Sequence, residues 1–150
     1  MKTKVLMVCL GNICRSPLAE GILKSKVDSS KVFVDSAGTA GYHVGNPPDH
    51  RSVAVAQKNG LNISGQRCRK FSQLDFLEFD HIYVMDKSNL SNVINLATTQ
   101  DQMNKVKLLL EEIDMNLNEV PDPYYGGQDG FEKVYQMIDL ACEAIAKKLN

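Results

Sequence analysis

Short apolar runs recur along the chain, and between them apolar residues return every three or four positions. Residues 5–8 form the first run, which is wholly apolar and is cut off by Gly11. A run of this length is typical of a buried strand. On the same grounds we expect strands in residues 31–35 and 81–86, and we interpret the ambiguous apolar run at 105–112 as a fourth.

Helices are predicted between these strands. Ser16 is suited to cap a helix whose first position is Pro17, where the missing N–H costs nothing. Residues 49–59, closed by Gly60, predict a second helix. Ser72 begins a pattern like a capping box, which predicts the start of a third.

The C-terminal segment has the clearest helical pattern. Its apolar residues fall on one face: Phe131, Val134, Tyr135, Ile138, Cys142, Ile145 and Leu149. Cys142 belongs to that face, so we expect it to pack in the core. With a further helix expected at 87–97, strands and helices alternate along the chain. This alternation predicts an α/β fold with a parallel sheet, whose ligands bind at the carboxyl ends of the strands.

Composition narrows the class of protein. A chain of 150 residues predicts a single domain covering residues 1–150. The formal charge of −1 argues against a nucleic-acid partner, and no apolar stretch approaches the length of a membrane span. The four cysteines include no CxxC pair, and the three histidines lack zinc-ligand spacing. We therefore expect no metal, no structural disulfide and a cytoplasmic location.

The segment CLGNICRSP carries the strongest chemical signal. Cys9 ends the first strand, Arg15 follows it closely, and Gly11 and Asn12 stand where a tight loop needs unusual backbone angles. A strand–loop–helix junction gathers backbone N–H groups into an anion-binding concavity, and the helix N-terminus adds positive charge. Arg15 can bind two phosphate oxygens at once, and Cys9 is expected to be a thiolate that attacks phosphorus. The competing interpretation, an inert buried cysteine and a surface arginine, explains less of this context.

Four motifs resemble those of the low-molecular-weight protein tyrosine phosphatases. They are VCLGNICRSPLAE near the N-terminus, DSAGT at residues 35–39, VMDKSNL at 84–90 and DPYYGG at 122–127. They keep the family's order, and the resemblance runs from Lys4 to the C-terminal helix. It implies a three-layer α/β fold with a four-stranded parallel sheet flanked by helices, and hydrolysis of phosphotyrosine without a metal or cofactor.

The resemblance also implies residue roles. Cys9 matches the nucleophile that forms a phosphocysteine intermediate, and Arg15 the residue that binds phosphate and stabilises the transition state. Asp122 matches the general acid, although an Asp-Pro surface turn is the simpler interpretation of that dipeptide alone. The competing carboxylates are Asp35, Asp49 and Asp86. The implied phosphate-binding set is Leu10, Gly11, Asn12, Ile13, Cys14, Arg15 and Ser16, in which Ser16 also stabilises the leaving thiolate.

The loop itself needs support. Asn12 is expected in the left-handed conformation, and Ser36 matches the family residue that anchors its side chain. Relatives often add a histidine in the segment that answers to SGQRCRKF, where this chain carries Gly65. Arg69 is a candidate for a further family arginine.

The resemblance suggests a cleft for a flat ring. Tyr124 and Tyr125 would wall it, with His50 at the rim and Ile13 packing on the ring. Two alternatives stay open: adjacent tyrosines often cover a core edge, and a histidine at a helix start is often solvated.

Rival functions share the same loop. Relatives that hydrolyse phosphoarginine carry threonine where this chain has Ile13, which favours phosphotyrosine over a protein arginine phosphatase. An arsenate reductase of the same fold would need cysteines near residues 80–92, where none occurs. A phosphocysteine carrier would not need Asp122, and a catalytically silent phosphotyrosine reader would not need Cys9.

Cys14 and the partners complete these expectations. Cys14 is a redox candidate that could trap oxidised Cys9 as a disulfide, or it could simply pack the loop. Implied partners are phosphotyrosine-bearing proteins, oxyanions such as phosphate in the site, and a tyrosine kinase, since some relatives are phosphorylated on the tyrosine pair. We expect a monomer or weak dimer.

Overall fold

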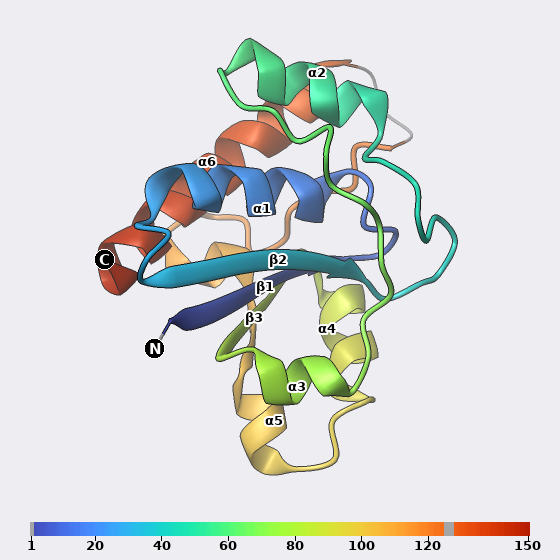
Figure 1. Cartoon of the computed structure of the whole chain (residues 1–150), viewed down its shortest axis with the longest axis vertical. Helices are drawn as coiled ribbons and strands as arrows, with labels where there is room; N and C mark the ends of the chain where they lie inside the picture. Colours follow the sequence, from blue (N-terminus) through green and yellow to red (C-terminus); the bar gives the residue numbers. More distant parts are fainter. Residues whose placement is uncertain (1, 125–127) are drawn as a thin grey trace.

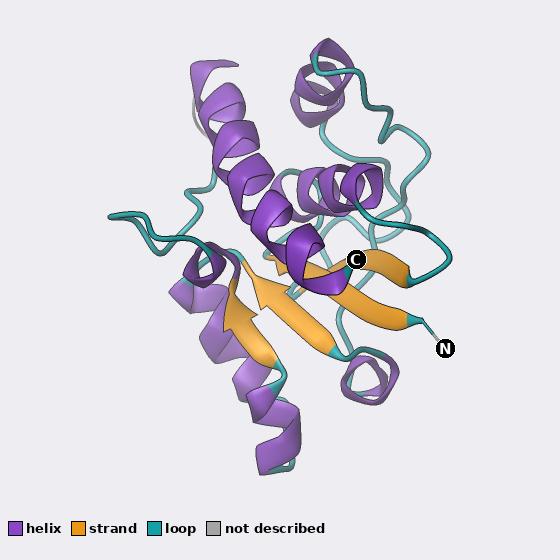
Figure 2. Cartoon of the chain, turned by 90° about the vertical axis from the view of Figure 1, so that its left-hand side faces the viewer, coloured by secondary structure: helices purple, strands orange, loops and turns teal. Residues whose placement is uncertain are grey.

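The computed structural model describes residues 2–124 and 128–150. Within these residues, one sheet of parallel strands forms the centre: β1 (Thr3–Cys9), β2 (Val32–Gly38), β3 (His81–Val84) and β4 (Val106–Leu108). The strand order is β2–β1–β3–β4, so β1 has a neighbour on each side (Figure 2). The predicted α/β class and four-stranded parallel sheet are confirmed.

Helices cover both faces of the sheet (Figure 1). On one face lie α1 (Arg15–Lys26) and α6 (Gln128–Leu149), with α2 (His50–Lys58) packed against them. On the other lie α3 (Leu74–Glu78), α4 (Lys87–Ile94) and α5 (Gln100–Asn104), and the 3-10 helix η1 (Leu109–Glu112) follows β4. Among the described residues, no helix combines the length and apolar character needed to cross a membrane.

Strand β1 is buried between two apolar cores. Val5 and Met7 pack on the side of α1 and α6, whereas Leu6 and Val8 pack on the opposite side with Phe76. This alternation follows from the two-residue period of a strand. Burial of each such side chain contributes about 1.5–3 kcal/mol. The carboxyl end of β1, where Cys9 lies, is therefore held from both faces.

The apolar face of α6 is confirmed as part of the first core. Phe131, Ile138, Cys142 and Ile145 are fully buried in it. Burial raises the pKa of the Cys142 thiol, so this cysteine is an uncharged packing residue, as predicted.

The start of α1 differs from the prediction. The helix begins at Arg15 with Cys14 in the cap position, and no side chain caps it. The predicted cap, Ser16, is inside the helix because its hydroxyl is bound to Cys9 and Asn12. No side chain at the cap position therefore competes with an anion at the start of α1.

Two strand boundaries also differ. β2 continues past Asp35 to Gly38 because it pairs with β1 along its whole length, ending at Cys9. The run 105–112 is a strand only at Val106–Leu108 and then becomes η1. Leu108 packs in one core and Leu109 in the other, so the chain turns across the edge of the sheet at this point.

The boundaries of the remaining helices show one confirmation and one omission. Asp49 caps α2, accepting the Arg51 N–H at 2.8 Å, as its position suggested. The helix predicted at 87–97 ends at Ile94, and α5 was not predicted. Its signal was present: Thr99 caps α5 by accepting the N–H of Gln102, the spacing of a capping box.

Candidate active site

The loop between β1 and α1 wraps around an anion-sized concavity. Asn12 has φ 57°, the left-handed conformation predicted for it. No peptide bond in the described residues is cis. In a trans peptide, the carbonyl of one residue and the N–H of the next point in opposite directions.

Donors outside the loop bind its carbonyl oxygens. Four of these bonds are Thr39 N–H to Cys9 O (2.9 Å), Ala40 N–H to Leu10 O (2.9 Å), Asp49 N–H to Ile13 O (2.8 Å) and Ser52 Oγ–H to Cys14 O (3.2 Å). Because these carbonyls face outwards, the N–H groups that follow them face inwards. The outer segments thereby shape a nest of donors over Cys9.

Cys9 is buried at the floor of this nest. Its Sγ lies 3.0 Å from Ser16 Oγ, and the Ser16 N–H points to it at 3.5 Å. The Asn12 side-chain N–H donates to the same Ser16 Oγ at 2.8 Å. Ser16 Oγ has one proton, and with Asn12 supplying its acceptor bond that proton is free to bind the sulfur. The hydroxyl and the main-chain N–H of Ser16 thus both face the Cys9 sulfur.

A buried polar network holds the Asn12 side chain. Its Nδ2 donates to Ser36 Oγ at 3.0 Å, and the Ser36 hydroxyl donates to Glu20 Oε1 at 2.6 Å. Its Oδ1 accepts the Arg69 N–H at 3.0 Å. The structure therefore brings Ser36 and Arg69 to the loop, although Arg69 acts through its backbone and its guanidinium pairs with acidic side chains elsewhere. Glu20 was missed, since one acid in a helix gives no sequence signal.

Arg15 crosses the site from the first turn of α1 with only 2% of its side chain exposed. Its Nη1 donates to Asp86 Oδ2 at 2.6 Å and to the Val120 carbonyl at 2.9 Å. Burial alone would lower the pKa of Arg15. The negative charge of Cys9 and the bond to Asp86 outweigh burial and hold that pKa above its ordinary value. Arg15 is thus a fixed positive charge beside the sulfur.

Asp86 is a site residue that the sequence interpretation left among the competitors. One of its oxygens binds Arg15 and the other caps α4 through the Asn89 N–H at 2.8 Å. Its position just after β3 was the available signal, because parallel strands present their carboxyl ends at one edge.

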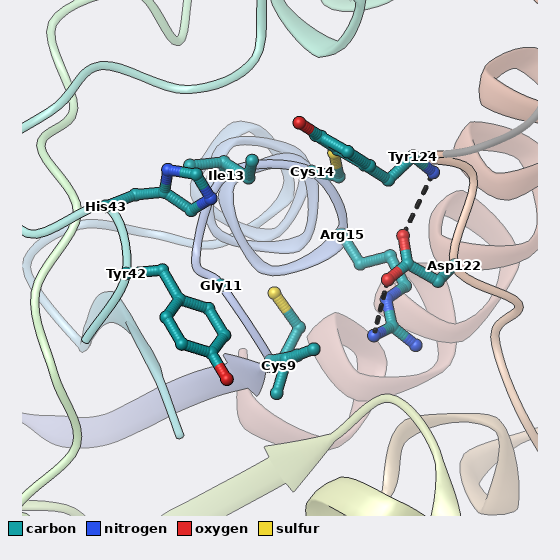
Figure 3. Close-up of a pocket in the computed structure, with 10 residues that line it drawn as sticks. Cys9, Gly11, Ile13, Cys14, Arg15, Tyr42, His43, Asp122 and Tyr124 are labelled. Carbon is teal, nitrogen blue, oxygen red and sulfur yellow. Dashed lines mark hydrogen bonds and ion pairs between the residues drawn. The ribbon is translucent and has the colours of Figure 1, made fainter. Parts of the chain in front are cut away.

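Asp122 enters from the segment that precedes α6. Its Oδ2 lies 3.7 Å from Arg15 Nη2, and its Oδ1 accepts the Tyr124 N–H at 3.0 Å. The carboxyl is 38% exposed and lines the same cavity as Cys9. Figure 3 shows it on the Arg15 side of the cavity, with the Cys9 sulfur between it and Tyr42.

The cavity has a volume of about 300 Å³ and combines apolar walls with the polar floor. Its lining consists of Cys9, Leu10, Gly11, Ile13, Cys14, Arg15, Tyr42, His43, Asp122 and Tyr124. Ile13 and Tyr124 were predicted here. Tyr125 lies outside the described residues.

The structure does not place His50, the predicted rim residue, among the residues that line the cavity. It is the first residue of α2, its side chain is 91% exposed, and the nearest charged partner is Asp49 at 3.9 Å. The segment between β2 and α2 instead places Tyr42 and His43 against the loop, and a Cβ on Gly11 would lie 3.3 Å from His43 Cδ2. An aromatic pair between glycines, just after a strand next to β1, was the missed signal.

Tyr124 is braced by a cation. The Arg51 guanidinium lies 5.4 Å from the Tyr124 ring centre and 4.7 Å from that of Phe131, and it pairs with Asp49 at 3.0 Å. The cavity wall is therefore tied to both α2 and α6.

Cys14 and Cys68 flank the loop as neutral thiols. Burial, followed by the negative charge of Asp49, raises the pKa of Cys14 to about 12. Burial, followed by the charge of Cys9, raises that of Cys68 to about 11. All four cysteines of the chain are free.

Comparison with known proteins places this site in a family. Residues 4–150 match the family model described as low molecular weight phosphotyrosine protein phosphatase. The chain belongs to that family. A low molecular weight phosphotyrosine protein phosphatase of Schizosaccharomyces pombe is 44% identical over 145 residues, covering 92% of each chain.

Solved structures of the family agree with the fold. A protein tyrosine phosphatase from Entamoeba histolytica, with Hepes in the active site, superposes with a TM-score of 0.93 at 36% identity, covering 99% of this chain and 97% of that one. Wzb of Vibrio vulnificus in complex with benzylphosphonate gives a TM-score of 0.88 at 32% identity, covering 99% of this chain and 100% of the other.

Proposed function

We propose that this member of the phosphatase family hydrolyses phosphotyrosine in proteins, with Cys9 as nucleophile, Arg15 as phosphate clamp and Asp122 as general acid. The observation that carries the proposal is that these three groups line one cavity whose floor is a nest of inward-facing N–H groups. No cofactor enters the reaction.

The first half of the reaction transfers the phosphoryl group to sulfur. Loop N–H groups and Arg15 bind the equatorial oxygens and stabilise the charge that spreads over them. The Cys9 thiolate forms the P–S bond while the P–O bond to the phenol breaks, and Asp122 gives its proton to the departing oxygen.

The second half of the reaction hydrolyses the phosphocysteine intermediate and regenerates the Cys9 thiolate. Asp122, now a carboxylate, accepts a proton from water as the water oxygen attacks phosphorus. The P–S bond breaks and the thiolate leaves towards the Ser16 hydroxyl, 3.0 Å away. Free phosphate and the starting protonation state of Cys9 result.

The shape of the cavity supports an aromatic substrate. Ile13, Tyr42 and Tyr124 offer apolar surface above the nest, which a phenyl ring covers and a seryl side chain is too short to reach. Benzylphosphonate, bound by the Wzb relative, joins a ring to a tetrahedral phosphorus group in the same way. The apolar Ile13 offers no partner to the guanidinium of phosphoarginine.

Side-by-side hydrolysis of p-nitrophenyl phosphate, phosphotyrosine, phosphoserine and phosphoarginine, together with arsenate reduction, tests the proposal. We expect turnover of the two aryl phosphates alone, inhibition by vanadate, and loss of turnover with retained phosphate binding in Cys9→Ser. Preferential turnover of phosphoarginine, or arsenate-dependent consumption of a thiol reductant, would assign the site to a different reaction.

Location and partners follow as proposals. Four free thiols fit a reducing compartment, so we place the protein in the cytoplasm. Its partners are then phosphotyrosine-bearing proteins and a tyrosine kinase, and it acts as a monomer or weak dimer.

A further inference from the structure

The main-chain carbonyl of Asn12 is held by a sulfur. The Cys68 thiol donates to the Asn12 carbonyl oxygen at 2.7 Å, and the adjacent Arg69 N–H donates to the Asn12 side chain at 3.0 Å. One short segment therefore binds the left-handed residue of the phosphate loop at its main chain and at its side chain.

We propose, on the basis of the phosphatase function above, that Cys68 is a positioning residue: its S–H keeps the Asn12 carbonyl outside the nest and so aims the Ile13 N–H at the phosphate. The link is geometric. Because the peptide bond between Asn12 and Ile13 is trans, its carbonyl and N–H point to opposite sides. A carbonyl turned inwards would remove one donor from the anion and replace it with a negative dipole.

The surroundings show why this carbonyl needs a side-chain donor. The carbonyls of Cys9, Leu10 and Ile13 are held by main-chain N–H groups of the segment between β2 and α2. The same segment also accepts a hydrogen bond from Cys68, whose N–H donates to the Asn46 carbonyl oxygen at 2.8 Å. The Cys68 main chain is thus anchored away from the loop, and its thiol bridges to Asn12.

The protonation state of Cys68 suits a donor. Cys68 is buried, and burial together with the nearby negative charge of Cys9 raises its pKa to about 11. It keeps its proton at neutral pH, where a thiolate would repel the Asn12 carbonyl. The two sulfurs near this loop therefore act differently: Cys9 is the nucleophile, and Cys68 donates a hydrogen bond to the Asn12 carbonyl oxygen.

Matched substitutions test the donor. Cys68→Ala removes the S–H, whereas Cys68→Ser retains a donor with a similar reach. We expect Cys68→Ala to weaken inorganic phosphate binding and to lower kcat/KM for p-nitrophenyl phosphate by about fivefold each, the usual effect of one lost hydrogen bond, and Cys68→Ser to stay near wild type. NMR titration with phosphate supplies the affinity and the shift of the Ile13 amide without turnover.

Controls separate this role from packing and from the proposed function. Cys142→Ala removes a fully buried thiol in α6, whose sulfur lies 3.8 Å from the Ala19 carbonyl oxygen, and should lower Tm while phosphate affinity is retained. If Cys68→Ala fails to fold, Cys68→Thr and Cys68→Val, which share one shape and differ in the donor, give the same comparison. Equal phosphate affinity within either pair would overturn the inference. Absence of turnover by the wild-type enzyme would instead reject the phosphatase function, and the binding comparison would still stand.

Discussion

Three cysteines lie in or against the phosphate loop, and their surroundings differ at the scale of single atoms. The Cys9 sulfur faces a hydroxyl and a helix N–H, both donors to negative charge. Cys14 and Cys68 are buried with negative charge nearby, which raises their pKa to about 12 and about 11. We therefore expect nucleophilic chemistry to be confined to Cys9, although neutral thiols stand close to it.

Alkylation should distinguish these thiols. We expect iodoacetamide at neutral pH to modify Cys9 and to leave Cys14 intact, since a thiol with a pKa of about 12 has almost no thiolate there. Peptide mass mapping measures both sites. Phosphate should protect Cys9, and labelling of Cys14 at a comparable rate would contradict the assignment.

Oxidation should link Cys9 and Cys14 by a disulfide bond. Peroxide converts the Cys9 thiolate to a sulfenic acid, and condensation with the Cys14 thiol then releases water and forms a disulfide. We expect a Cys9–Cys14 peptide after peroxide treatment and recovery of activity with dithiothreitol. In Cys14→Ala the loss of activity should be irreversible; reversible loss in that variant would reject the role of Cys14.

The acid role of Asp122 depends on the leaving group. Asp122→Asn should slow hydrolysis of phenyl phosphate by about 10²- to 10⁴-fold, and that of p-nitrophenyl phosphate much less, because the activated leaving group needs no proton. Steady-state rates for the two esters measure the ratio. Asp101→Asn, on exposed α5, is the matched control. Equal losses for both esters would remove Asp122 from this role.

At the scale of elements, the site is assembled from the carboxyl ends of neighbouring strands. β1 supplies the sulfur, the residues after β3 supply Asp86, and the end of β2 supports the loop from outside. At Gly38, the end of β2 and the loop after β1 come close together. A Cβ there would lie 2.9 Å from the Leu10 carbonyl oxygen and 3.1 Å from the Asn12 nitrogen. The loop can approach β2 only because that side chain is missing.

Gly38→Ala should therefore displace the loop. We expect a loss of about 1–3 kcal/mol in the free energy of unfolding together with weaker vanadate inhibition. Urea denaturation and inhibition assays measure the two effects. Gly65→Ala, where an added Cβ meets nothing within 4 Å, should change neither; normal vanadate inhibition in Gly38→Ala would show that the loop tolerates the displacement.

The sequence predicted elements better than their ends. Ser16 has the pattern of a helix cap, but its hydroxyl is used by Cys9 and Asn12, a tertiary demand that no local pattern contains. Likewise the sequence interpretation named His50 for the cleft and did not consider Tyr42, because only the path of the chain after β2 decides which ring reaches the loop.

At the scale of the whole molecule, the two cores fix the sheet between its helical layers. The alternation of apolar runs made this arrangement predictable, since buried parallel strands and one-sided helices leave clear periodicities. The short α5 and η1 escaped because a few residues show no period. The buried acid Glu20 escaped because its partner Ser36 lies in a different element, 16 positions along the chain.

A substitution in the core, far from the cavity, should lower stability without changing catalysis. Ile138→Ala empties part of the core beneath α6 and should lower the free energy of unfolding by about 2–5 kcal/mol, with kcat/KM per folded molecule unchanged. Leu140→Ala, on the exposed side of the same helix, should cost far less. Urea denaturation and kinetics on the folded fraction test both. A fall in kcat/KM for Ile138→Ala would couple the core to the site.

Arg15 is already paired with carboxylates of the protein before any substrate arrives. Asp86 binds it at 2.6 Å and Asp122 stands 3.7 Å away, so an incoming oxyanion competes with carboxylates of the protein itself. Asp86 is still bound to the guanidinium when inorganic phosphate departs. Because Arg15 shares its charge with this carboxylate throughout, we expect the product to be held loosely, which favours rapid emptying of the cavity between turnovers.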